Sequence, residues 1–126
     1  MTEVVYDAAV LIAADRNDRR AWAEHKFLLK EGVVPLVPSA VLAQVSRSAR
    51  QAQLPRFLRG CIVVPLDEPM AHAAGRLLAA ARTADVVDAC VVIVAMRFHA
   101  RIVTGDPGDI EDLVAASGVR LTVVAR

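Results

Sequence analysis

Residues 84–96 read ADVVDACVVIVAM and place two carboxylates directly before the most apolar uninterrupted run of the chain. The two acids, Asp85 and Asp88, are three residues apart, so in a helix they stand one turn from each other. An ionised carboxylate beside a hydrophobic core is costly unless a partner compensates it. The stretch therefore predicts a buried helix over 86–99, opened by two acids whose position requires a physical reason.

The composition indicates a single domain with one sizeable core. The chain has 126 residues, 56% of them hydrophobic and only 4% aromatic. This balance is typical of buried parallel strands covered by Ala-rich helices. No run approaches the roughly 18 apolar residues of a membrane span, and the start of the chain lacks the basic region of a secretory signal. We therefore expect a cytoplasmic protein with no membrane partner.

Apolar segments of strand and helix type alternate along the chain. The expected strands are 3–6, 33–38, 61–66, 101–104 and 119–124. The expected helices are 18–32, 39–50 (capped by Ser39), 53–59, 68–82, 86–99 and 107–116, with a helix or turn over 8–14. Alternation of this kind predicts an α/β fold with a parallel sheet and helices on both faces. Sites in such sheets gather outside the carboxyl ends of the strands.

Several acids fall at the expected carboxyl edge of the sheet. Asp7 follows the first strand, Asp106 and Asp109 follow the strand 101–104, and Asp85 and Asp88 open the helix that leads into that strand. Two carboxylates repel each other by about 3 kcal/mol at about 5 Å and an effective dielectric of about 20. A divalent cation would neutralise such a cluster, and oxygen ligands favour Mg²⁺ or Mn²⁺. The chemistry indicated is phosphodiester hydrolysis.

Each acid also has a structural interpretation. Asp85 can cap the helix 86–99, with Asp88 as a favourable acid in its first turn. Asp106 and Asp109 flank Pro107-Gly108 and can form a turn followed by a helix cap. Asp7 lies between the apolar segments VVY and AAVLIAA, which makes a surface position hard to explain. The metal hypothesis therefore rests on the combination of acids.

The other notable side chains are expected to be structural. Cys61 and Cys90 are flanked by apolar residues, which favours buried free thiols. Trp22 and Phe27 are expected in the core or at an interface. The three histidines lack zinc-ligand spacing and are expected on partly exposed helix surfaces, not as catalytic bases: His25, His72 and His99.

A basic segment runs from Arg47 to Arg59, with four arginines and no acid. Arginine binds phosphate bidentately, and phosphate contacts supply most non-specific nucleic-acid affinity. Arg47 and Arg50 are therefore candidate contacts to a nucleic-acid substrate. A solvated helix face and a surface for an acidic partner are the alternatives.

Four segments in order resemble the PIN-domain ribonucleases, particularly VapC-type toxins of type II toxin–antitoxin systems. They are VVYDAAVLIAADR, VPSAVLAQVSR, DVVDACVVIVA and IVTGDPGDIEDL, and together they span nearly the whole chain. The resemblance implies a PIN-like three-layer α/β/α domain over residues 1–126 with a central, mostly parallel sheet. It also implies an endoribonuclease that depends on Mg²⁺ or Mn²⁺, an RNA substrate, a cognate antitoxin and a homodimer.

The resemblance also assigns roles to residues. It places Asp7, Asp88 and Asp106 in the metal site, with Gln44 and Asp85 supporting catalysis and Asp109 as a further candidate to assist. It makes Thr104 a polar site residue that contacts substrate or holds a carboxylate or water, beside the candidate phosphate contacts Arg47 and Arg50.

One position departs from the family pattern. The second motif usually carries glutamate, whereas its best match here is Gln44, and no acid occurs between Glu31 and Asp67. Gln44 offers a neutral oxygen that can ligate a metal or hold its water but adds no charge, so a weaker metal site is expected unless Asp85 or Asp109 compensates. The alternative is that Gln44 is an ordinary polar helix residue. The alternative function is a weakened module that binds RNA or an antitoxin without efficient turnover. Restoring the charge with Gln44→Glu distinguishes the two.

Overall fold

The computed structural model describes residues 3–126 and is built around a five-stranded sheet. The strands are β1 (Val4–Tyr6), β2 (Leu36–Pro38), β3 (Ile62–Val64), β4 (Arg101–Thr104) and β5 (Val123–Ala125). The helices are α1 (Ala8–Asp15), α2 (Arg19–Lys30), α3 (Ser39–Val45), α4 (Gln53–Leu58), α5 (Glu68–Ala81), α6 (Val86–Phe98) and α7 (Pro107–Ser117). The strand order is β3-β2-β1-β4-β5, and every pairing is parallel.

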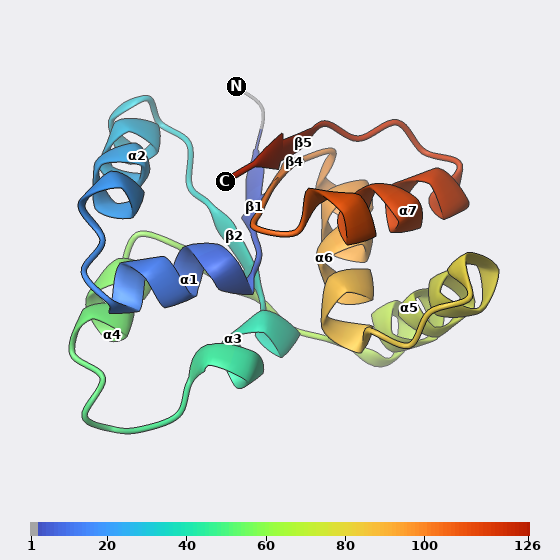
Figure 1. The fold of residues 1–126 in the computed structure, drawn as a ribbon, viewed down its shortest axis with the longest axis horizontal. Coiled ribbons are helices and arrows are strands. Elements are labelled where there is room, and N and C mark those ends of the chain that lie inside the picture. Colours follow the sequence, from blue (N-terminus) through green and yellow to red (C-terminus); the bar gives the residue numbers. More distant parts are fainter. Residues whose placement is uncertain (1–2) are drawn as a thin grey trace.

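Two layers of helices enclose the sheet (Figure 1). Helices α1, α2 and α4 lie on one side, and α5, α6 and α7 lie on the other. Helix α3 lies beyond the end of β2, between α1 and α6. Because all strands are parallel, each connection must cross over through a helix, and this produces the two layers. The expected α/β fold with a PIN-like three-layer arrangement is confirmed.

Helix α6 forms the centre of the core, as the apolar run at 86–99 predicts. Its buried residues occupy several sides of the helix, as expected for a helix enclosed by other elements: Ala89, Cys90, Val91, Val92, Val94 and Ala95. The helix ends at Phe98, because the following residue, His99, has a φ of 52° and leaves the helical region. Cys90 is buried, Cys61 is partly buried, and both thiols are free, as expected.

The segment after β2 differs from the prediction. Helix α3 ends at Val45, well before Arg50, and the Ser39 hydroxyl does not cap it. That hydroxyl instead accepts a hydrogen bond from the Leu66 backbone N–H at 3.0 Å. The helix stops where the apolar pattern of SAVLAQV gives way to a polar stretch. The final strand is also shifted towards the end of the chain, to β5 at Val123–Ala125.

The inner side of α2 corrects the prediction for His25. Its side chain is only 2% exposed, where a partly exposed position was expected. The ring stacks on Phe57 with centroids 3.8 Å apart, and Nδ1 lies 2.9 Å from the Tyr6 hydroxyl. Trp22 meets Phe57 edge-on at 5.1 Å and is half-buried, whereas Phe27 is 62% exposed and therefore lies outside the core.

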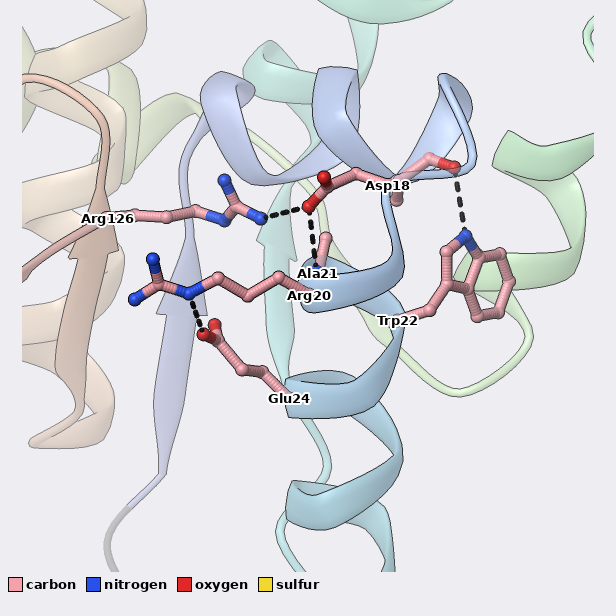
Figure 2. Close-up of polar contacts among 7 residues, drawn as sticks. Asp18, Arg20, Ala21, Trp22, Glu24 and Arg126 are labelled. Atoms are coloured by element: carbon pink, nitrogen blue, oxygen red, sulfur yellow. Dashed lines mark hydrogen bonds and ion pairs between the residues drawn. The ribbon is translucent and has the colours of Figure 1, made fainter.

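Helix α2 is anchored at its start by polar contacts (Figure 2). The Asp18 carboxylate accepts from the Ala21 N–H at 3.0 Å and from Arg126 Nη2 at 2.8 Å, so it ties the helix to the end of the sheet. The Trp22 indole N–H donates to the Ala14 carbonyl at 3.0 Å. These contacts fix the orientation of α2 relative to α1.

Across residues 3–126, every helix is too short or too polar to cross a lipid bilayer.

Candidate functional site

Three helices begin next to one another at the carboxyl ends of β1 and β4 (Figure 1). Each begins directly after an aspartate that caps it: Asp7 for α1, Asp85 for α6 and Asp106 for α7. A carboxylate at a helix N-terminus satisfies free N–H groups and favours the helix dipole. The capping interpretation of Asp85 and Asp106 is therefore confirmed, and the same caps bring the acids to one edge of the sheet.

Asp7 is held firmly at this edge. Its side chain is 6% exposed, and its oxygens accept from the Ala9 N–H at 3.0 Å and the Gly105 N–H at 3.1 Å. A Cβ at position 105 would lie 2.5 Å from Ala9 Cβ, so only glycine permits this approach of β4 to α1. The burial that the sequence suggests for Asp7 is confirmed.

Thr104 connects two of the acids. Its hydroxyl donates to Asp7 Oδ2 and accepts from the Asp106 N–H at 2.9 Å. The side chain has no exposed surface. Of the roles predicted for Thr104, holding a carboxylate is the one that the geometry favours, because a fully buried hydroxyl has no surface on which to contact RNA.

The carboxylates of Asp88, Asp106 and Asp109 converge. Each offers an oxygen that lies within 4.8 Å of those of the other two, which is compatible with one shared cation. The predicted metal set contained Asp7 in place of Asp109. Asp109 lies one turn after Asp106 on α7, while the oxygens of Asp7 are directed to Thr104 and Gly105.

The electrostatics of the cluster are unfavourable without a cation. Burial, followed by the charges of Asp85, Asp7, Asp106 and Asp109, raises the pKa of Asp88 to about 7. Burial also raises the pKa of Asp7, against hydrogen bonds that lower it. A hydrogen bond with Asp106 and the charge of Asp106 raise the pKa of Asp109. An all-oxygen donor set of this charge fits Mg²⁺ or Mn²⁺.

The supporting acid and amide lie around the cluster. Asp85 is exposed, and its Oδ1 accepts from the Asp88 N–H at 3.0 Å, so it fixes the start of α6 and adds negative charge near Asp88. Gln44 is exposed on α3, the helix between α1 and α6. Its role stays a prediction.

The two candidate phosphate contacts lie in the loop after α3. Arg47 and Arg50 are both exposed. Arg47 Nη1 donates to the carbonyls of Ala43 at 2.8 Å and Ser46 at 3.1 Å, so its guanidinium closes the end of α3. This engagement leaves Arg50 as the freer of the two arginines.

Comparison with known proteins shows the fold. No protein-family model matches the sequence, and no curated protein sequence is significantly similar to it. A chain of the VapBC2 complex from Rickettsia felis, bound to a promoter DNA fragment, superposes with a TM-score of 0.76 at 16% identity over 99% of both chains. A chain of a toxin–antitoxin complex from Klebsiella pneumoniae gives 0.65 at 17% identity over 84% of this chain and 88% of the other. FitAcB from Neisseria gonorrhoeae gives 0.65 at 15% identity over 96% of both chains.

These findings correct the family assignment made from the sequence. The identification of the chain as a VapC-type PIN-domain ribonuclease is wrong as a statement of family. No family model supports it, and the similar structures are toxin–antitoxin assemblies that do not single out one kind of chain. At identities of 15–17%, the likeness establishes a shared fold.

Proposed function

We propose that this protein hydrolyses RNA phosphodiesters with Mg²⁺ or Mn²⁺ and acts as the toxic component of a toxin–antitoxin pair. The observation that carries the proposal is the convergence of Asp88, Asp106 and Asp109 beside buried Asp7. Mutual repulsion in this cluster costs stability, and the cost is explained when the cluster holds a divalent cation.

The side chains have distinct roles in this proposal. Asp88, Asp106 and Asp109 hold the cation, and Asp7 adds a further negative charge beside Asp88, whose pKa is raised first by burial and then by the charge of Asp85. Thr104 keeps Asp7 and the backbone of Asp106 in place. A bound divalent cation supplies Lewis acidity for attack on a phosphodiester.

A protein partner is the second part of the proposal. The similar structures are complexes of toxin with antitoxin, which favours an antitoxin as the partner of this chain. An apolar groove of about 450 Å³ lies between α2 and the β4–β5 edge and includes the exposed Phe27 and Val124. Such a groove is compatible with a bound protein segment. The homodimer and the cytoplasmic location stay predictions.

The test is cleavage of end-labelled RNA by the antitoxin-free protein with Mg²⁺, with Mn²⁺ and with a chelator. We expect metal-dependent cuts that disappear in Asp88→Asn and persist in Glu111→Gln, which removes an exposed acid of α7 outside the cluster. Loss of one electrostatic group at a reacting centre lowers the rate by about 100- to 1000-fold. Cuts that survive both the chelator and Asp88→Asn would overturn the metal site.

The alternative is a module that binds RNA or antitoxin without efficient turnover, and the observation that favours it is the uncharged Gln44. Metal binding without cleavage of a broad RNA pool would support this alternative over the nuclease.

A further inference from the structure

A basic pocket lies at the opposite end of α1 from Asp7. It has a volume of about 330 Å³ and combines three cationic side chains, one indole and two amides. The residues that define it come from the α1–α2 turn, α2 and α4: Asn17, Arg19, Trp22, Lys26, Gln53 and Arg56. Within residues 3–126, no carboxylate lines it. We call this set the basic pocket.

The acids closest in sequence to the basic pocket are already engaged elsewhere. Asp15 accepts from Gln51 Nε2 at 3.0 Å and from the Leu54 N–H at 3.2 Å. Asp18 binds Arg126 and Glu24 binds Arg20, each at 2.8 Å (Figure 2). The ion pairs formed within residues 3–126 therefore include none of the three pocket cations, Arg19, Lys26 and Arg56. Their positive charge is available to a ligand.

The indole of the basic pocket is held in a fixed orientation. Trp22 Nε1 donates to the Ala14 carbonyl at 3.0 Å (Figure 2). The indole also meets the Phe57 ring edge-on, with centroids 5.1 Å apart. The Arg56 guanidinium lies 5.5 Å from the ring centroid. A fixed indole beside a planar guanidinium offers stacking surfaces for a base at little entropic cost.

We propose that the basic pocket binds one nucleotide of a single-stranded RNA whose scissile phosphate lies at the acidic site. Arg19, Lys26 and Arg56 neutralise backbone phosphate, and Trp22 stacks against a base. Gln53 Oε1 accepts from Arg56 Nη1 at 2.9 Å, so the Asn17 amide and the Gln53 Nε2 group supply the hydrogen-bond groups for the edge of that base. The identity of the ligand as substrate RNA rests on the proposed function.

The length of α1 sets the shortest RNA that can reach both the acidic site and the basic pocket. Helix α1 has eight residues and is therefore about 12 Å long. Asp7 caps its first turn, and Asn17 follows its last residue by two positions. A strand that reaches both sites has to span the length of α1, so a mononucleotide fills only the basic pocket. An acidic peptide is the competing ligand, but it would use the cations alone and leave the indole and the amides without a role.

Trp22 provides a direct readout, because it is the only tryptophan of the chain. The full chain is titrated, free of antitoxin and in chelator, with a short single-stranded RNA of mixed sequence. We expect a saturable change of Trp22 emission that weakens as salt rises. Arg19→Ala and Lys26→Ala, two exposed positions, each lower the affinity and reduce the slope of log K against log salt by about 0.7.

Arg76→Ala is the matched control, because it removes one exposed arginine from α5 in the other helical layer. It should leave the titration unchanged. The proposal is overturned if Trp22 does not respond, if Arg76→Ala weakens binding as much as Arg19→Ala, or if a polyglutamate peptide binds the pocket more tightly than RNA.

This test separates the pocket from the nuclease. A Trp22 response in a protein that never cleaves RNA would leave the pocket standing and refute the proposed chemistry. Cleavage with Mg²⁺ and no Trp22 response would support the nuclease and refute the pocket.

Discussion

Two neighbouring regions treat their titratable groups in opposite ways. They meet where β1 ends, because Tyr6, its last residue, belongs to one region and Asp7, the cap of α1, belongs to the other. The acidic edge consists of the four aspartates around the end of β1: Asp7, Asp88, Asp106 and Asp109. The aromatic cluster joins β1 to α2 and α4: Tyr6, Trp22, His25 and Phe57. Tyr6 directs its hydroxyl to His25, and Asp7, the next residue, belongs to the acidic edge.

The difference is whether the chain satisfies its own polar groups. In the aromatic cluster, the Tyr6 hydroxyl and His25 Nδ1 form a hydrogen bond with each other, and the Trp22 N–H donates a hydrogen bond to the Ala14 carbonyl. At the acidic edge, backbone N–H groups donate at the caps, but none of the ion pairs formed within residues 3–126 involves these four carboxylates, and the pKa of Asp88 rises to about 7. A group that the fold leaves uncompensated is a candidate for function, whereas a satisfied one is structural.

Phe57→Ala, a substitution in the aromatic cluster, should produce the largest change in stability. Phe57 is fully buried and contacts the rings of Tyr6, Trp22 and His25. We expect the free energy of unfolding to fall by about 3–5 kcal/mol in urea titrations, because a large cavity replaces the ring. Phe27→Ala, at a 62% exposed position, should change it by at most about 0.5 kcal/mol. Equal losses in the two variants would refute the packing assigned to Phe57.

Asp88→Asn should act in the opposite direction at the acidic edge. Removing this charge relieves repulsion, so the metal-free protein at pH 8 should unfold at a higher temperature. Each kcal/mol gained corresponds to roughly 4 °C for a chain of this size. The rise in Tm that Mg²⁺ gives the wild type should be lost. Calorimetry with Mg²⁺ and with a chelator measures both effects, and Glu111→Gln should leave both unchanged. A destabilised Asp88→Asn would show that this carboxylate is already compensated.

The two regions should respond to pH with opposite signs. The folded-state pKa of Asp88 is raised from 3.8 to about 7, so between about pH 4 and 7 the unfolded state binds fewer protons and stability falls as pH rises. Burial lowers the pKa of His25 below its ordinary value of 6.5, so stability falls as pH drops below about 6.5. Each group contributes a slope of at most about 1.4 kcal/mol per pH unit.

Single substitutions test which residue causes each change of stability with pH. In metal-free urea titrations from pH 4 to 8, Asp88→Asn should flatten the decline on raising pH, and His25→Gln should flatten the decline on lowering it. If Asp88→Asn flattened the decline on lowering pH and His25→Gln flattened the decline on raising pH, the burial assigned to both groups would be contradicted. Mg²⁺ should stabilise the wild type more at pH 8 than at pH 5, because the proton on Asp88 competes with the cation.

The sequence predicts the fold well because the fold depends on local patterns. Alternating apolar segments predict the order of elements, and the burial of Asp7 is predicted because this acid lies between two apolar runs. The end of α3 at Val45 was also readable, since SRSARQAQ after it is polar. The prediction of a helix to Arg50 is wrong because this stretch, although it contains helix-forming Ala and Arg, has no apolar face to pack against the core.

The parts that the sequence did not predict depend on contacts between distant segments. His25 lies among charged neighbours in AEHK, and nothing local indicates its contacts with Tyr6, 19 residues away, and with Phe57. Asp109 is among the acids expected at this edge, but its place beside Asp88 and Asp106, where Asp7 was expected, depends on the start of α7 facing the start of α6. The basic segment 47–59 likewise contributes Arg56 to a pocket whose other cations, Arg19 and Lys26, come from α2.

Gln44→Glu should produce the smallest change and tests whether the acidic edge extends to α3. If Gln44 faces the acidic edge, a carboxylate there adds repulsion to the metal-free protein and attraction for the cation. We then expect a lower Tm in chelator together with about tenfold tighter Mg²⁺ binding by calorimetric titration, which corresponds to about 1.4 kcal/mol. Gln51→Glu, outside the edge and hydrogen-bonded to Asp15, should lower the Tm without changing Mg²⁺ affinity. Unchanged Mg²⁺ affinity in Gln44→Glu would make Gln44 an ordinary exposed helix residue, and the acidic edge would then be complete with its four aspartates.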